Sequence, residues 1–182
     1  MEKHLYLIAI IPPKEIRDRV HALKLEMKER FNAKHALKAP VHITLQMPFW
    51  LEDEDESVTI RHLTSFADEQ KPFPILLNGF DAFEQRVLFI KIENHQPIKE
   101  LHQRLNRILI QNLHFPQNRV INELHPHMTI ATRDLTESNF YSAWSEFNDK
   151  PFKEKFRAES ISLLKHNGNN WDIYKTLPFQ KE

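Results

Sequence analysis

The chain has 182 residues, enough for one domain that buries a hydrophobic core without cross-links. It has no cysteine, which excludes disulfides, thiolate nucleophiles and cysteine-ligated zinc and agrees with a cytoplasmic location. Lys and Arg together number 25, as do Asp and Glu, and this balance argues against binding to a long nucleic acid. Two glycines are too few for a glycine-rich phosphate-binding loop.

The first predicted element is a short buried strand over residues 5–11, closed by two prolines. We expect a strand here and not a signal peptide, because no small-residue cleavage site follows. An amphipathic helix over 13–31 comes next, and a loop leads from it into the strand PVHITLQMPF (40–49), which carries His42. No apolar run approaches the roughly 20 residues that span a bilayer, so we expect no membrane association.

The rest of the chain continues this order of elements. An acidic run over 52–56 is expected to be a solvated loop. The elements predicted after it are helix 57–70, strand 73–83, strand 87–93, helix 97–113, a strand holding His127, helix 136–149, strand 156–165, and strand 171–177, which closes a hairpin with its turn in 166–170. Asp134 and Glu137 resemble a capping box at the start of the fourth helix.

The two halves of the sequence share one layout. Each half has a strand, a proline, an amphipathic helix, a loop and a strand with the pattern His-x-Thr. Pro13 precedes His42 by 29 positions, and Pro97 precedes His127 by 30. We therefore expect a single bilobal domain over 1–182, with approximate sequence halves 1–85 and 86–182 that derive from a duplication.

The repeated His-x-Thr pattern predicts a site. Side chains two positions apart in a strand point the same way, so His42 lies beside Thr44 and His127 beside Thr129. If the two strands are neighbours, two imidazoles and two hydroxyls converge. One neutral imidazole can take a proton from water, the other can protonate a leaving oxygen, and the hydroxyls can bind the oxygens of a phosphodiester.

A third copy of the pattern, His62-Leu63-Thr64, lies in a predicted helix. Residues two apart on a helix do not share a face, so we assign this copy no role. It is therefore an internal control for the other two.

The motifs HITL (42–45) and HMTI (127–130), with PHMTIA around the second, resemble those of the 2H phosphoesterases, also called the LigT-like or 2′-5′ RNA ligase-like superfamily. This resemblance implies a bilobal α+β fold, with two mostly antiparallel sheets facing a central cleft and helices outside. It implies hydrolysis of 2′,3′-cyclic phosphate or 2′-5′ phosphodiester bonds, in RNA ends or small nucleotides, without metal or cofactor. Carried over, His42 and His127 are the acid/base pair, and Thr44 and Thr129 bind the phosphate. We expect a monomer.

Two other functions fit the same residues. A non-catalytic protein that binds RNA ends or nucleotides would use the same scaffold. A metal-dependent hydrolase would use His125 and His127, with Glu123 on the same face.

Several further side chains are candidates for contacts with a ligand. Gln46 follows Thr44 on its face and faces either ligand or solvent, and Arg133 supplies charge near the phosphate or pairs with Asp134 or Glu137. The aromatic residues that could stack a base, with core packing as the default, are Tyr6, Phe49, Trp50 and Phe89.

Overall fold

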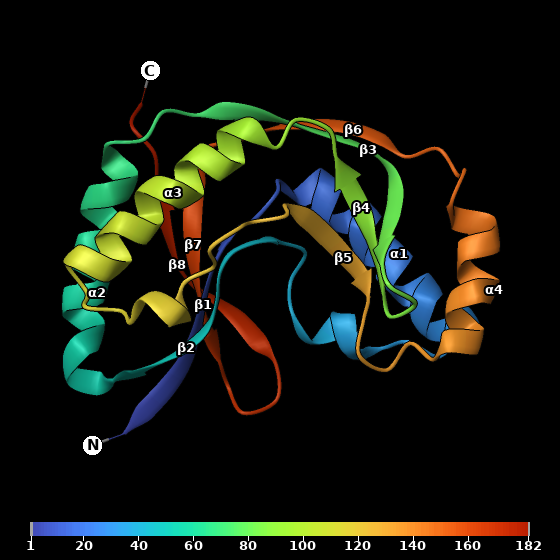
Figure 1. Cartoon of the computed structure of the whole chain (residues 1–182), viewed down its shortest axis with the longest axis horizontal. Coiled ribbons are helices and arrows are strands. Elements are labelled where there is room, and N and C mark those ends of the chain that lie inside the picture. The colour runs from blue at the N-terminus through green and yellow to red at the C-terminus, as the bar shows by residue number, and fades with distance from the viewer. Residues whose placement is uncertain (1, 182) are drawn as a thin grey trace.

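The computed structural model describes residues 2–181 and has two four-stranded sheets, with helices outside them (Figure 1). The elements in chain order are β1 (Lys3–Ile10), α1 (Lys14–Phe31), η1 (His35–Lys38), β2 (Ile43–Glu52), α2 (Asp53–Asp68), β3 (Phe73–Phe83), β4 (Val87–Ile92), α3 (Gln96–Gln111), η2 (Gln117–Arg119), β5 (His127–Ala131), α4 (Glu137–Phe147), β6 (Lys153–Ala158), β7 (Ser160–His166) and β8 (Trp171–Pro178). Sheet 1 has the order β2-β1-β7-β8 and sheet 2 the order β5-β4-β3-β6, and all pairs are antiparallel. The predicted α+β class is confirmed.

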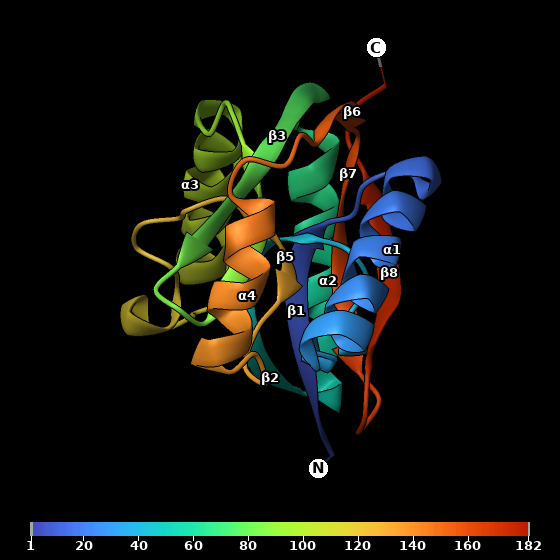
Figure 2. The same ribbon diagram turned by 90° about the vertical axis from the view of Figure 1, so that its right-hand side faces the viewer.

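Each sheet combines strands from both halves of the sequence. Sheet 1 joins β1 and β2 to β7 and β8 from the other end of the chain, and sheet 2 joins β3 to β4, β5 and β6. The helices of the first half also pack against elements of the second half. Helix α1 packs against β5 and α4, and α2 packs against β2, β8 and α3 (Figure 2). The strands that hold or follow the motif histidines, β2 and β5, are edge strands that contact one another.

The core lies between each sheet and the helices that cover it. Along β1, alternate side chains Tyr6, Ile8 and Ile10 enter the main core, while Leu7 and Ala9 face the other side with Leu164. This alternation is the period expected of a strand that is apolar on both faces. Within residues 2–181, no helix combines the length and apolar character needed to cross a bilayer.

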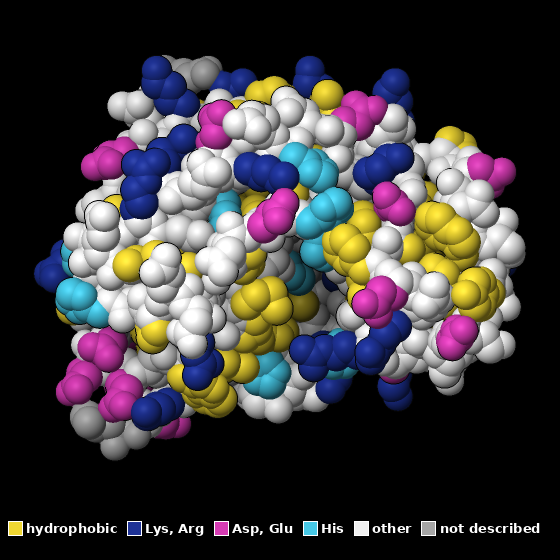
Figure 3. Space-filling model, viewed as in Figure 1, with side chains coloured by type: hydrophobic (Ala, Val, Ile, Leu, Met, Phe, Trp, Pro, Cys, Tyr) yellow, Lys and Arg dark blue, Asp and Glu magenta, His cyan; other side chains and the backbone are white. Residues whose placement is uncertain are grey.

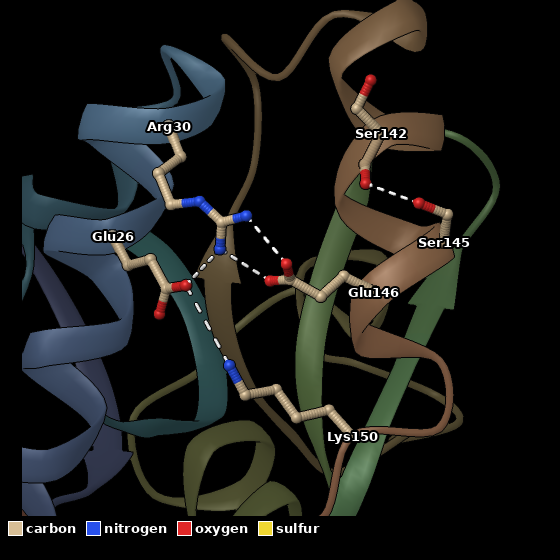
Figure 4. Close-up of polar contacts among 6 residues, drawn as sticks. All are labelled: Glu26, Arg30, Ser142, Ser145, Glu146 and Lys150. Carbon is tan, nitrogen blue, oxygen red and sulfur yellow. Dashed lines mark hydrogen bonds and ion pairs between the residues drawn. The ribbon is translucent and has the colours of Figure 1, made fainter.

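Ion pairs join α1 to α4 at the surface (Figure 4). The Arg30 guanidinium donates to both oxygens of Glu146, at 2.6 and 2.8 Å, and to Glu26 at 2.5 Å. Lys150 Nζ lies 4.0 Å from Glu26 and sits over the Phe147 ring. These groups are mostly exposed, so water and salt screen each pair, and apolar contacts such as that between Phe31 and Phe147 hold the helices together.

The single strand predicted over 156–165 is wrong. Two strands occupy this region and belong to different sheets, because β6 pairs with β3 and β7 pairs with β1. Glu159 separates them, at the point where the chain passes from sheet 2 to sheet 1. Buried positions alternate in β6, at Phe156 and Ala158, whereas in β7 every position from Ile161 to Leu164 is buried. The difference follows the passage of the chain from an edge strand of sheet 2 to an interior strand of sheet 1.

The acidic run over 52–56, predicted as a solvated loop, is also different in the structure. Helix α2 begins at Asp53, so its first turn holds four carboxylates where the helix dipole favours negative charge. Glu56, the last of them, accepts hydrogen bonds from the Tyr6 and Tyr174 hydroxyls and from Lys165 Nζ. Burial alone would raise the pKa of Glu56, but these bonds outweigh it and hold the pKa at about 2. Glu56 therefore ties α2 to sheet 1.

Replacing Glu56 by glutamine should lower the free energy of unfolding at pH 7 by about 1–3 kcal/mol, because three donors lose a charged acceptor. A lowered carboxyl pKa stabilises the fold above about pH 4.5, and this contribution is lost as the pH falls towards 2. Urea unfolding at several pH values measures the difference, which should shrink in acid. The matched control is Glu54→Gln in the same turn, where the side chain is exposed. Equal losses in both variants would contradict the assignment.

The capping box predicted from Asp134 and Glu137 is wrong. The N-cap of α4 is Thr136, whose hydroxyl accepts the Asn139 amide at 3.2 Å. The Asp134 carboxylate instead accepts the backbone N–H groups of Lys34 and His35, at 3.0 and 3.0–3.1 Å. Asp134 thus pins the segment after α1 to the segment after β5.

Candidate active site

His42 and His127 are held by the same local interaction. His42 directly precedes β2, and His127 is the first residue of β5. The His42 Nδ1 lies 2.7 Å from the carbonyl oxygen of Pro40, and the His127 Nδ1 lies 2.7 Å from that of His125. A carbonyl can only accept, so Nδ1 carries the proton in both rings. Each neutral ring therefore has an unprotonated Nε2 available for chemistry.

The two motif histidines lie at strands that contact one another, β2 and β5. His127 is among the groups whose charge lowers the pKa of His42. The face shown in Figure 3 is hollowed near its centre, with histidine side chains gathered at one rim and Lys or Arg side chains at the other. The structure thus brings the two predicted histidines together.

Thr44 and Thr129 occupy the predicted positions beside the histidines. Thr129 pairs with Phe89 and His127 with Lys91, while Met128 between them is buried in the core, so His127 and Thr129 share a face. Val41, Ile43 and Leu45 are buried, whereas His42 and Thr44 are half-buried. Neither threonine hydroxyl makes a hydrogen bond to another residue in the described range 2–181. Both are free to donate to a ligand.

Burial lowers the pKa of both histidines. For His42 the value falls to about 4: burial is the largest cause, the charges of Lys24 and His127 add to it, and the Pro40 carbonyl opposes it. For His127, burial is again the largest cause and lowers the pKa. The hydrogen bond to the His125 carbonyl raises this pKa, and the charge of His125 lowers it slightly. Both rings are therefore neutral at pH 7 in the free protein.

Gln46 does not follow Thr44 as the alternation predicts. A β-bulge falls between them, because Thr44 pairs with Ala9 and Gln46 with the next residue back, Ile8. Gln46 is consequently buried, and its amide donates to the carbonyls of Met47 and Arg119, at 3.2 and 2.9 Å. It braces β2 against η2 and faces neither ligand nor solvent.

Of the aromatic residues considered for base stacking, one remains accessible. Tyr6, Phe49 and Phe89 are buried, whereas Trp50 is 64% exposed. The ring of Phe89 lies 5.1 Å from that of His127, between centroids, and the Phe83 ring lies 4.8 Å from it. Phe89 therefore positions a histidine and presents no face to a base.

The surroundings of His125 and Arg133 concern two further predictions, the metal site on His125 and His127 and the ion pairs of Arg133. The His125 ring packs against Phe83 at 4.9 Å and His95 at 5.1 Å, and lies 6.4 Å from the His127 ring. Within residues 2–181, the group with metal-ligand spacing is Glu2, His4 and Asp53, not the set built on His125 and His127. Arg133 is exposed and makes no ion pair with Asp134 or Glu137 within the described chain.

Sequence reasoning missed Lys24, whose charge acts on His42. The signal was present in α1, where Ile16, Val20, Met27 and Phe31 form a buried stripe and Lys24 occupies the position between Val20 and Met27. A charged residue inside an apolar stripe is unusual, because burying a charge is costly.

Comparisons with known proteins agree with this architecture. The model of the 2′-5′ RNA ligase superfamily matches residues 12–170. "Putative phosphoesterase OB1230" of Oceanobacillus iheyensis is 29% identical, over 94% of this chain and 95% of its own. Among solved structures, TT0787 of Thermus thermophilus superposes with a TM-score of 0.71 at 18% identity, covering 98% of this chain and 99% of that one. Escherichia coli LigT, complexed with 3′-AMP, gives 0.67 at 18% identity, covering 99% and 100%.

The two structural neighbours share the fold, and the family model covers both His-x-Thr segments. The resemblance to 2H phosphoesterases indicated by the motifs is confirmed, and the chain belongs to the 2′-5′ RNA ligase superfamily.

Proposed function

We propose that this protein is a metal-independent phosphodiesterase. It hydrolyses 2′,3′-cyclic phosphate or 2′-5′ phosphodiester bonds, in RNA ends or small nucleotides. The observation that carries the proposal is the matched pair of imidazoles, each with Nδ1 bonded to the carbonyl two residues earlier and each beside a free threonine hydroxyl. Superfamily membership, relatives named phosphoesterases and a neighbour crystallised with 3′-AMP support it.

The proposed chemistry uses both imidazoles in one displacement. A neutral Nε2 removes a proton from water as the water oxygen bonds to phosphorus. The opposite Nε2–H donates its proton to the ester oxygen as the phosphorus–oxygen bond breaks. Thr44 and Thr129 donate to the non-bridging oxygens, where negative charge grows. The two histidines have then exchanged protonation states, and solvent restores them.

The environments of the rings suggest how the roles divide. The pKa of His42 is lowered to about 4 by burial and by two neighbouring charges, so this ring stays neutral and suits the base. No lysine acts on His127, whose pKa is lowered mainly by burial. A bound phosphodiester anion favours the charged form of a nearby imidazole, so His127 suits the acid.

The proposal is tested with a panel of nucleoside 2′,3′-cyclic phosphates and 2′-5′ dinucleotides, assayed in excess EDTA. We expect turnover of at least one substrate class that does not depend on added metal. Saturable binding without turnover on every member would instead indicate the non-catalytic nucleotide-binding protein. Activity that EDTA abolishes and metal restores would indicate the metal-dependent hydrolase.

The pH dependence of kcat/KM should be bell-shaped, with its maximum on the acid side of pH 6.5. This parameter reports the free enzyme, where His42 is deprotonated above about pH 4 and the lowered pKa of His127 leaves less of the protonated acid as the pH rises. The maximum of kcat should lie at higher pH, because the bound anion raises both pKa values. Profiles from pH 4 to 9, with circular dichroism to confirm folding, measure both. A kcat/KM that is flat between pH 5 and 8 would contradict the scheme.

A further inference from the structure

Lys24 is a buried lysine directly beneath the segment that leads to His42. It is 2% exposed, within the apolar stripe of α1. Its ammonium donates to the carbonyl oxygens of Ala36 and Ala39, at 2.9 and 3.0 Å. One side chain thus ties down both η1 and the residue that precedes Pro40.

No carboxylate forms an ion pair with Lys24 anywhere in residues 2–181. Burial lowers its pKa to about 8, so the side chain still carries a charge at pH 7. Burying an ammonium group without an opposite charge is unfavourable, and two carbonyl oxygens offset only part of that cost. Packing alone would favour an aliphatic residue at this position, as elsewhere in the stripe.

The two motif histidines differ in how they are held. His127 lies within the β-ladder, paired with Lys91, and its ring packs against Phe83 and Phe89. His42 lies one residue outside the β2 ladder, and residues 39–42 have no strand partner. The Pro40 carbonyl that orients the His42 ring is therefore only as well fixed as the segment that Lys24 holds.

Charge provides a second link between Lys24 and His42. The charged groups that act on His42 are Lys24 from α1 and His127 from β5, and both favour the neutral ring. The ammonium therefore disfavours protonation of the histidine whose loop it anchors.

We propose that Lys24 is a positioning residue for the candidate site: its buried ammonium binds the Ala36 and Ala39 carbonyls, fixes the Pro40 carbonyl that orients His42, and adds a positive charge to the surroundings of that imidazole. The effect of Lys24 on catalysis rests on the proposed function. Its effect on the His42 ring does not.

The test compares Lys24→Met, which removes the ammonium but keeps an unbranched chain, with Lys28→Met, an exposed position one turn along α1. In Lys24→Met we expect kcat to fall by about 10–100-fold, as for a misplaced reacting group, with KM changed less than about threefold. In Lys24→Met, the acid limb of the kcat/KM pH profile, which reports deprotonation of His42, should move to higher pH. In Lys24→Arg, which keeps the charge, this limb should lie at the wild-type pH, and Lys28→Met should match the wild type in kcat, KM and pH profile.

Titration of the His42 ring by NMR completes the test and needs no substrate. The pKa of His42 should rise in Lys24→Met and stay low in Lys24→Arg and Lys28→Met. Lys24→Gln, which keeps an N–H donor without charge, serves if the methionine variant does not fold, and it too should raise the pKa. An unchanged His42 pKa in the uncharged variant overturns the proposal. If no panel substrate is turned over, the proposed function fails, and this titration still decides the role of Lys24.

Discussion

Replacement of His42 or His127 by alanine should lower kcat by about 10²–10⁴-fold each, because each variant loses one proton-transfer group. Both Nδ1 atoms bond to the backbone of their own chain segment, so removing either ring breaks one hydrogen bond to a carbonyl oxygen and none between elements. His127→Ala also loses the ring contacts with Phe83 and Phe89. The fold should therefore survive, and KM should change much less than kcat. Steady-state kinetics in EDTA, on a substrate identified from the panel, measure both parameters.

His62→Ala is the matched control for the histidine variants. His62 also belongs to a His-x-Thr triplet, but it lies in α2, where Thr64 bonds to the Ile60 carbonyl one turn back. Wild-type kinetics are expected for this variant. A loss in His62→Ala comparable to the losses in His42→Ala and His127→Ala would mean that the effects come from general damage to the fold.

The second large effect is expected for the threonines. Valine has the shape of threonine without the hydroxyl, so Thr44→Val and Thr129→Val remove one hydrogen bond to the phosphate each and preserve the strands. By analogy with the loss of one oxyanion donor, kcat should fall by about 10²-fold in each variant. Neither hydroxyl has a partner within residues 2–181, so thermal stability should not fall.

The kinetic signature distinguishes transition-state binding from ground-state binding. An interaction made only in the transition state lowers kcat and kcat/KM equally, whereas one present throughout raises KM alone. Thr64→Val in α2 is the control and should behave as the wild type. A rise in KM with unchanged kcat in both Thr44→Val and Thr129→Val would remove the assigned role of the hydroxyls.

The parts of this molecule that follow a simple period could be predicted from the sequence. Strand β3 was predicted at its observed limits, and β1, β4, α1 and α3 within a few residues, because apolar positions recur at two or at about 3.6 residues throughout them. The paired histidines could be found for the same reason: their neighbours alternate, so the strand context was readable. The convergence of the two strands followed from the repeat and not from either motif alone.

Other features depend on contacts that no local pattern carries. Glu56 looked like part of a solvated charge run because its three donors lie about 50 to 118 positions away in sequence, on β1, β7 and β8. Asp134 looked like a cap because its true partners, the amides of Lys34 and His35, lie about 100 positions earlier in the sequence. The bulge that turns Gln46 inward breaks the period within a strand, and a single sequence gives no warning of it.

The double variant His42→Ala/His127→Ala shows whether His42 and His127 act on the same phosphodiester bond. Groups that act as one unit lose most of their effect when either is removed. We expect the kcat of the double variant to lie within a few-fold of that of the slower single variant. If the loss of kcat in the double variant equals the product of the two single losses, the two imidazoles work independently and do not share one phosphodiester bond.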